Sequence, residues 1–137
     1  MVQRDVIISR LDKLKEYLFN LKNISVYSKD EYIKNPLLYG SCERFLHLSI
    51  ECVLDIANHT ISDMNYRKPE NNRDVFEILY ENQIIDFKLK ENLCNMAGFR
   101  NILVHDYLKL NRGMVFDIVL NNLDDIRKFA KIIADYL

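Results

Sequence analysis

Residues 36–65 read PLLYGSCERFLHLSIECVLDIANHTISDMN, and this stretch decides the fold. Pro36 suits the first turn of a helix, where its missing N–H leaves no hydrogen bond unmade. Beyond it, apolar residues recur at three- and four-residue steps at Leu46, Ile50, Val53 and Ala57. This spacing places them on one helix face. It predicts a helix over residues 36–65 that buries an apolar stripe.

Similar patterns lie on both sides of this stretch. Residues 2–24 and residues 114–137 each read as a long amphipathic helix, because charged residues separate apolar residues at helical spacing. Ser28 or Asp30 is a candidate cap for a short helical segment or loop that stops at Asn35, before the proline.

Two more helices are expected in the second half of the chain. A short one opens at Val75 with Asn72 as its cap, and a longer one runs from a cap at Asp86 to about Tyr107. The pair Arg112-Gly113 then predicts a turn before the last helix.

The whole chain therefore favours helix packed on helix. Its 137 residues include only 3 Gly and 2 Pro, 49% are apolar, and strand-like alternation persists nowhere. Long amphipathic helices joined by short polar links bury their stripes best as an antiparallel bundle. We expect an all-α antiparallel bundle of about four main helices plus short helices, with residues 1–137 forming a single domain.

Charge and cysteine content exclude several classes of protein. Nineteen Lys and Arg against 20 Asp and Glu give a net charge of -1, so any nucleic-acid site must be local. Charged residues interrupt every apolar stretch long before it reaches the roughly 20 residues that a membrane span needs. Asp5 and Arg10 lie where a signal peptide requires an unbroken apolar run. We expect a cytoplasmic protein without a membrane partner. Cys42, Cys52 and Cys94 form no close pair, which predicts buried free thiols.

A metal site is one hypothesis for the middle of the chain. His59 lies four residues from both Asp55 and Asp63, so one helix face presents an Asp-His-Asp column. Metal sites in helix bundles draw Glu and His from several helices, and here the other histidines are only His47 and His105. A histidine oriented by Asp55, or simply a polar face, is the favoured interpretation, and we expect no metal and no cofactor.

Other polar and aromatic residues have a plain structural interpretation. The charged residues Glu43, Arg44 and Glu51 are expected to form a solvated or internally paired helix face. The sequence contains no GxxxxGK[ST], GxGxxG, GxSxG or HExxH motif, which excludes those enzyme classes as far as motifs can. Four phenylalanines could stack on bases, but core packing is favoured for them: Phe45, Phe76, Phe87 and Phe99.

The run GFRNILVHDY at residues 98–107 concentrates polar groups at the end of an otherwise apolar helix. At 100° per residue, Arg100 and Tyr107 share a face, whereas Arg100 and His105 lie about 140° apart. Arg100 and His105 meet only if the helix ends or distorts, if the arginine reaches round, or if a second copy supplies one of them. The competing interpretation is a helix C-terminus whose negative dipole end favours the imidazolium of His105.

The spacing Arg100-x4-His105-x-Tyr107 resembles the R-x4-H-x-Y signature of HepT-type toxins of the HEPN superfamily. Three other stretches are also similar to that family. They are Cys42-Glu43-Arg44, residues 54–59 (LDIANH) and residues 96–101 (MAGFRN). The resemblance covers residues 40–137, the N-terminal helix fits as well, and no position of the motif departs from the family pattern.

This resemblance implies an all-helical homodimer in which the motif helices of two subunits line one cleft. It implies a metal-independent ribonuclease toxin whose partner is a small MNT-type nucleotidyltransferase antitoxin. Carried onto this chain, Arg100 and His105 are catalytic, and Asn101 is the polar residue that follows the arginine. Tyr107 is the residue that the antitoxin modifies with AMP.

The side chains suit that chemistry. Histidine has an unperturbed pKa that allows it to take the ribose 2′-OH proton near neutral pH, and arginine stabilises charge on the phosphorane. Such a reaction leaves a 2′,3′-cyclic phosphate and spares DNA, which lacks the 2′-OH. The rival hypothesis is a non-catalytic helical interaction module that binds a nucleotidyltransferase or a nucleotide. The sequence leaves open the RNA substrate and the number of AMP groups.

Overall fold

The computed structural model describes residues 2–105 and 110–137, and in these residues it contains α helices and no strand. The predicted continuation of the fifth helix to Tyr107 falls outside the described residues. The four long helices and two short ones confirm the all-α prediction: α1 (Val2–Ile24), α2 (Lys29–Lys34), α3 (Pro36–Asp63), α4 (Asn72–Glu81), α5 (Phe87–His105) and α6 (Arg112–Tyr136).

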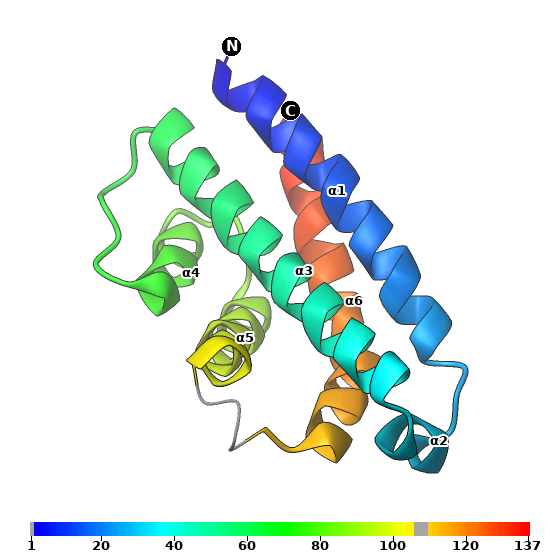
Figure 1. The fold of residues 1–137 in the computed structure, drawn as a ribbon. Helices are drawn as coiled ribbons and strands as arrows, with labels where there is room; N and C mark the ends of the chain where they lie inside the picture. Colours follow the sequence, from blue (N-terminus) through cyan, green and yellow to red (C-terminus); the bar gives the residue numbers. More distant parts are fainter. Residues whose placement is uncertain (1, 106–109) are drawn as a thin grey trace.

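Helix α3 is the centre of the bundle and contacts each of the other five helices. It runs antiparallel to α1, α6 packs against both, and α4 and α5 cover the opposite side of α3 (Figure 1). The buried apolar residues form one cluster to which all six helices contribute. Within it, the rings of Phe76 and Phe129 meet edge to face, with their centroids 6.3 Å apart.

Local hydrogen bonds explain where several helices begin. Ser28 forms a capping box with Glu31, since the Ser28 side chain accepts from the Glu31 N–H and the Glu31 carboxylate accepts from the Ser28 N–H, both at 3.1 Å. Asn35 caps α3 at the N–H of Leu37, with the proline at the first helical position, and Asp86 accepts from the N–H of Leu89 at 2.8 Å. These caps confirm Ser28, Pro36 and Asp86 as start signals.

Three sequence predictions about boundaries are wrong. The cap of α4 is Asn71, not Asn72, because the Asn71 side chain accepts from the N–H of Asp74 and Asn72 is already helical. The pair Arg112-Gly113 is not a turn but the first turn of α6, where the Asn111 side chain accepts from the N–H of Met114. At the other end of α3 the helix stops at Asp63 rather than residue 65, because Asn65 takes the left-handed φ of 57° that ends helices.

Candidate active site

A column of polar residues follows one face of α3 at four-residue steps. It comprises His47, Glu51, Asp55 and His59. The Nε2 atom of His47 lies 3.5 Å from Oε1 of Glu51, and Nε2 of His59 lies 3.5 Å from Oδ1 of Asp55. Because residues four apart are neighbours on a helix, the helix itself presents two acidic groups in line, each beside a histidine.

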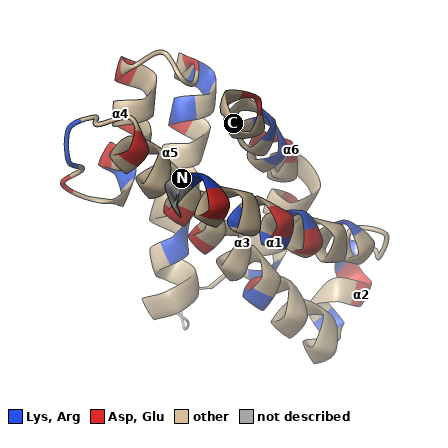
Figure 2. Ribbon diagram, turned by 90° about the horizontal axis from the view of Figure 1, so that it is seen from above, with Lys and Arg blue, Asp and Glu red and all other residues tan. Residues whose placement is uncertain are grey.

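Arginines from two other helices bind these two carboxylates. The Nε–H of Arg100, on α5, donates to Oε1 of Glu51. The Nε–H of Arg10, on α1, donates to Oδ2 of Asp55 at 2.5 Å, and this hydrogen bond raises the pKa of Arg10. The α3 column therefore links α1 and α5 through two ion pairs. Basic and acidic residues are interspersed along α1 in Figure 2, so Arg10 does not belong to a block of like charge.

The two ion pairs border a hollow of about 370 Å³, which we call the Arg100 groove. Its lining mixes charged, amide and apolar side chains, and it is formed by Arg10, Tyr17, Leu48, Glu51, Cys52, Leu54, Asp55, Asn58, Asn72 and Arg100. The Arg100 side chain is 23% exposed and that of Glu51 is 40% exposed. The guanidinium is therefore held in place and still reachable from solvent.

The residues predicted from the motif lie in different surroundings. Arg100 borders the groove, and its Nη1 lies 3.4 Å from Oδ1 of Asn101, which is exposed. His105 is exposed at the last residue of α5. No hydrogen bond or ion pair joins Arg100 to His105 within residues 2–105 and 110–137. Tyr107, the predicted AMPylation site, lies outside the described residues.

The column Asp55, His59 and Asp63 is not a metal cluster. In the part of the chain that the structure describes, no group of three or more His, Cys, Asp or Glu could hold a metal ion. Asp55 instead accepts from Arg10 and faces His59, as the favoured interpretation predicted. Asp63 is exposed at the end of α3.

The four phenylalanines divide into two groups. Phe76 is buried, and Phe45 and Phe99 pack against the core, as predicted. Phe87 contradicts the prediction because it is 56% exposed. Its ring lies at the edge of α5, where it meets Tyr80 edge to face and lies under the ammonium of Lys90 at 4.5 Å.

The cysteines are free and buried, as expected. Desolvation raises the pKa of each thiol, and that of Cys42 to about 11. Neighbouring Glu43 is also buried, and its Oε2 accepts no hydrogen bond from any residue that the structure describes. Burial raises the pKa of Glu43, while the charge of Arg112 opposes the shift. The Arg112 guanidinium stacks 4.1 Å from the ring of Tyr39. Glu43 therefore forms part of the packing beneath the start of α6 rather than of the Arg100 groove.

Sequence reasoning missed the roles of Glu51 and Arg10 in this site. A usable signal for Glu51 was present, because the four-residue spacing that links Asp55 to His59 continues back through Glu51 to His47. The internally paired face expected for Glu51 is confirmed, and its partner is Arg100. For Arg10 no such signal exists, since its partner lies 45 residues away.

The described residues form an all-helical bundle with Arg100 near the end of α5, and solved structures place this architecture among HEPN-type helical proteins. The solved structure of the tri-AMPylated HEPN toxin of Shewanella oneidensis in complex with MNT antitoxin matches with a TM-score of 0.89 and 30% sequence identity, over 96% of this chain and 98% of that one. The family model described as Ribonuclease HepT-like matches residues 7–133, and the chain belongs to that family.

Two relatives named as HepT nucleases extend over nearly the same length. The mRNA nuclease HepT of Shewanella oneidensis is 30% identical over 133 residues, which are 94% of this chain and 96% of the relative. The tRNA nuclease HepT of Aphanizomenon flos-aquae is 29% identical over 132 residues, covering 96% of this chain and 90% of the relative.

The described part of this chain has no helix of the length and apolarity that crossing a bilayer requires.

Proposed function

We propose that this chain is a metal-independent endoribonuclease and the toxin of a HEPN–MNT toxin–antitoxin pair, acting in the cytoplasm. The observation that carries the proposal is the sequence run Arg100-x4-His105-x-Tyr107, whose Arg100 and His105 lie near the end of α5, in a chain that the HepT family model spans from residue 7 to residue 133. Relatives named as mRNA and tRNA nucleases support RNA as the substrate. The single buried core supports residues 1–137 acting as one domain.

In this mechanism His105 takes the proton of the ribose 2′-OH, and the resulting oxyanion attacks the adjacent phosphorus. Arg100 stabilises the charge that develops on the phosphorane. Its contact with Glu51 uses the Nε–H, so Nη2 and the second N–H of Nη1 remain to face phosphate oxygens. Asn101, beside Nη1, supports the same guanidinium. When the bond to the 5′ oxygen breaks, the leaving oxygen takes a proton back from the protonated His105 or from water, which leaves a 2′,3′-cyclic phosphate and a 5′-hydroxyl.

We place the reaction in a cleft between two copies of the chain. Arg100 and His105 are five residues apart on one helix, so they point about 140° apart, while Arg100 faces Glu51 on α3. A second subunit brings an arginine from one copy near a histidine from the other without distorting either helix. The exposure of His105 at the end of α5 supports this arrangement.

We further propose that an MNT-type nucleotidyltransferase antitoxin silences the enzyme by transferring AMP to Tyr107. The support comes from the solved relative, a tri-AMPylated HEPN toxin in complex with MNT antitoxin. Tyr107 follows Arg100 by seven residues, a spacing that in an uninterrupted helix would put both residues on one face. Added AMP would bring bulk and negative charge beside the arginine, where the RNA phosphate must bind.

The test is cleavage of mixed cellular RNA in excess EDTA by protein shown to be free of AMP by intact mass. Wild-type protein is compared with His105→Ala and with Lys34→Ala, a control at an exposed residue of α2 outside the Arg100 groove. We expect the wild type and the control to yield cyclic phosphate ends, with His105→Ala inactive but folded and DNA untouched. If unmodified wild-type protein cuts no RNA, the chain is instead the non-catalytic interaction module.

A further inference from the structure

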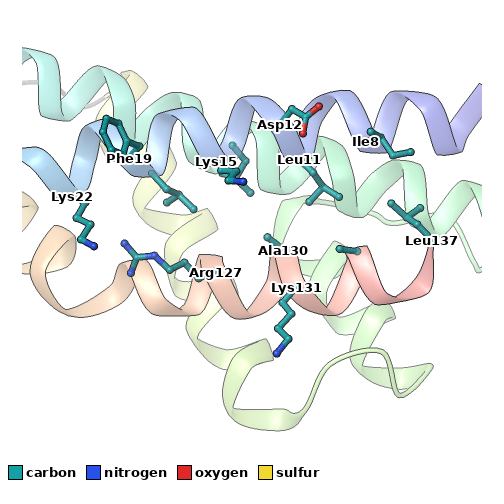
Figure 3. A pocket seen from close by; sticks show the side chains of 13 residues that line it. Ile8, Leu11, Asp12, Lys15, Phe19, Lys22, Arg127, Ala130, Lys131 and Leu137 are labelled. Atoms are coloured by element: carbon teal, nitrogen blue, oxygen red, sulfur yellow. The ribbon is translucent and has the colours of Figure 1, made fainter.

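A second hollow, of about 730 Å³, lies between α1 and α6 on a face that the Arg100 groove does not share. The two helices run antiparallel here, so Ile8 lies near Leu137 at one end and Lys22 near Arg127 at the other (Figure 3). We call this hollow the α1–α6 groove. Its floor is aliphatic, yet Ile8 is 40% exposed and Phe19 is 65% exposed along it. Apolar side chains left open in a groove indicate an interaction surface.

Basic residues surround this apolar floor. Lys15, Lys22, Arg127 and Lys131 line the α1–α6 groove, and Asp12 is the one acidic side chain among its lining residues. The chain as a whole has a net charge of -1, so the excess is a local feature. Arg127 also bonds the exposed Asp124 at 2.8 Å, whereas the three lysines form no ion pair with any described residue. Their charges are available to an anionic partner.

The dimensions suit one further helix. Ile8 and Lys22 are fourteen residue steps apart on α1, which span about 21 Å at 1.5 Å per residue. That length corresponds to about four turns of a helix lying in the groove between two packed helices. Its apolar stripe would cover Phe19 and Ile8, and acidic residues on its flanks would face the basic rim.

We propose that the α1–α6 groove is the docking site for an acidic amphipathic helix of a partner protein. A second copy of this chain fits poorly, because a two-fold interface sets the same patch against itself and would bring the two basic rims together. Nucleic acid fits the rim but leaves the aliphatic floor without an apolar partner. The proposal stands independently of the ribonuclease proposal, since the groove contains none of the motif residues.

The probe is a synthetic, fluorescein-labelled helical peptide of about four turns, with leucines on one face and glutamates on both flanks. Two matched peptides carry glutamine or lysine in place of glutamate. Binding to the 137-residue protein is followed by fluorescence anisotropy. The double variant Lys15→Glu with Lys22→Glu is compared with Lys34→Glu, an exposed lysine on α2 outside the groove. Phe19→Ser is compared with Leu120→Ser, a half-exposed apolar residue of α6 that does not line the groove.

We expect the wild type to prefer the glutamate peptide. The double charge reversal should lower the affinity for the glutamate peptide by about tenfold and raise the affinity for the lysine peptide. Lys34→Glu should change either affinity by less than about twofold. Phe19→Ser should lower the affinity for the glutamate peptide by about tenfold, whereas Leu120→Ser should leave it unchanged. Circular dichroism confirms that each variant is folded.

Three results would overturn the proposal. The first is equal affinity of the wild type for the glutamate and glutamine peptides. The second is a lower mass of Phe19→Ser than of wild type in sedimentation equilibrium, which would make the groove a contact between copies. The third is loss of binding to a single-stranded RNA oligonucleotide in the double variant without any effect on the peptides, which would make the rim an RNA surface.

Discussion

Glu51 is expected to be a positioning residue for Arg100. Its carboxylate accepts from Nε–H of Arg100 and lies 3.5 Å from Nε2 of His47. It does not itself belong to the R-x4-H-x-Y run. Replacing Glu51 with alanine should leave the arginine charged and present but free to rotate, whereas glutamine keeps an oxygen acceptor for the same N–H. The two variants therefore separate orientation of the guanidinium from the charge of the carboxylate.

The size of the effect follows from the exposure of the pair. A hydrogen bond to a charged group contributes about 1.5–3 kcal/mol when shielded, and an exposed ion pair about 0.2–1 kcal/mol. Side-chain exposures of 23% for Arg100 and 40% for Glu51 place this contact between those limits. We take about 1.4 kcal/mol for the contact. If all of this free energy is lost from the transition state, kcat falls about tenfold.

The assay is steady-state cleavage of RNA by AMP-free protein, with kcat and KM measured separately. Glu51→Ala should lower kcat about tenfold and Glu51→Gln by less than about threefold. The control is Glu81→Ala, which removes a comparable contact at 2.7 Å to Arg67 on a remote surface and should leave kcat unchanged. The positioning role is refuted if Glu51→Ala retains full kcat, if glutamine is as harmful as alanine, or if the control slows the enzyme equally.

Three further predictions concern the dimer, the thiols and a buried carboxyl. Mixing inactive Arg100→Ala and inactive His105→Ala subunits should restore part of the ribonuclease activity, because mixed dimers contain one intact composite site; no recovery would mean that each site uses a single chain. The native protein should show almost no reaction with a thiol reagent at pH 8, since burial raises the pKa of Cys42 to about 11 and shields all three cysteines. After denaturation, three thiols should react. Rapid reaction of the native protein would contradict the burial of the cysteines. Burial raises the pKa of Glu43 in the folded state, so the stability of the wild type should fall as pH rises through the ordinary glutamate range. Glu43→Gln should therefore melt at a higher temperature than wild type at pH 7 but not at pH 4. A lower melting temperature of the variant at pH 7 would show that the charge of Arg112 outweighs desolvation.

The features that sequence could predict are local ones. A helix over residues 36–65 follows from apolar spacing, and the caps at Ser28 and Asp86 follow from side chains that bond an N–H three residues ahead. The errors were local too. Asn71 and Asn72 are equally good caps by type, and the structure selects Asn71 through its bond to Asp74. The Gly at position 113 suggested a turn, but the Asn111 cap begins the helix before it.

The motif run at residues 98–107 and the polar spacing on α3 are both properties of the sequence, since they depend on periodicity along one helix. Only the tertiary structure pairs them, because Glu51 and Arg100 are 49 residues apart and Arg10 and Asp55 are 45 apart. No local rule decides which acidic residue an arginine reaches when the chain has 20 of them. That choice depends on how α1 and α5 pack on α3, and hence on the burial of the apolar stripes of all six helices.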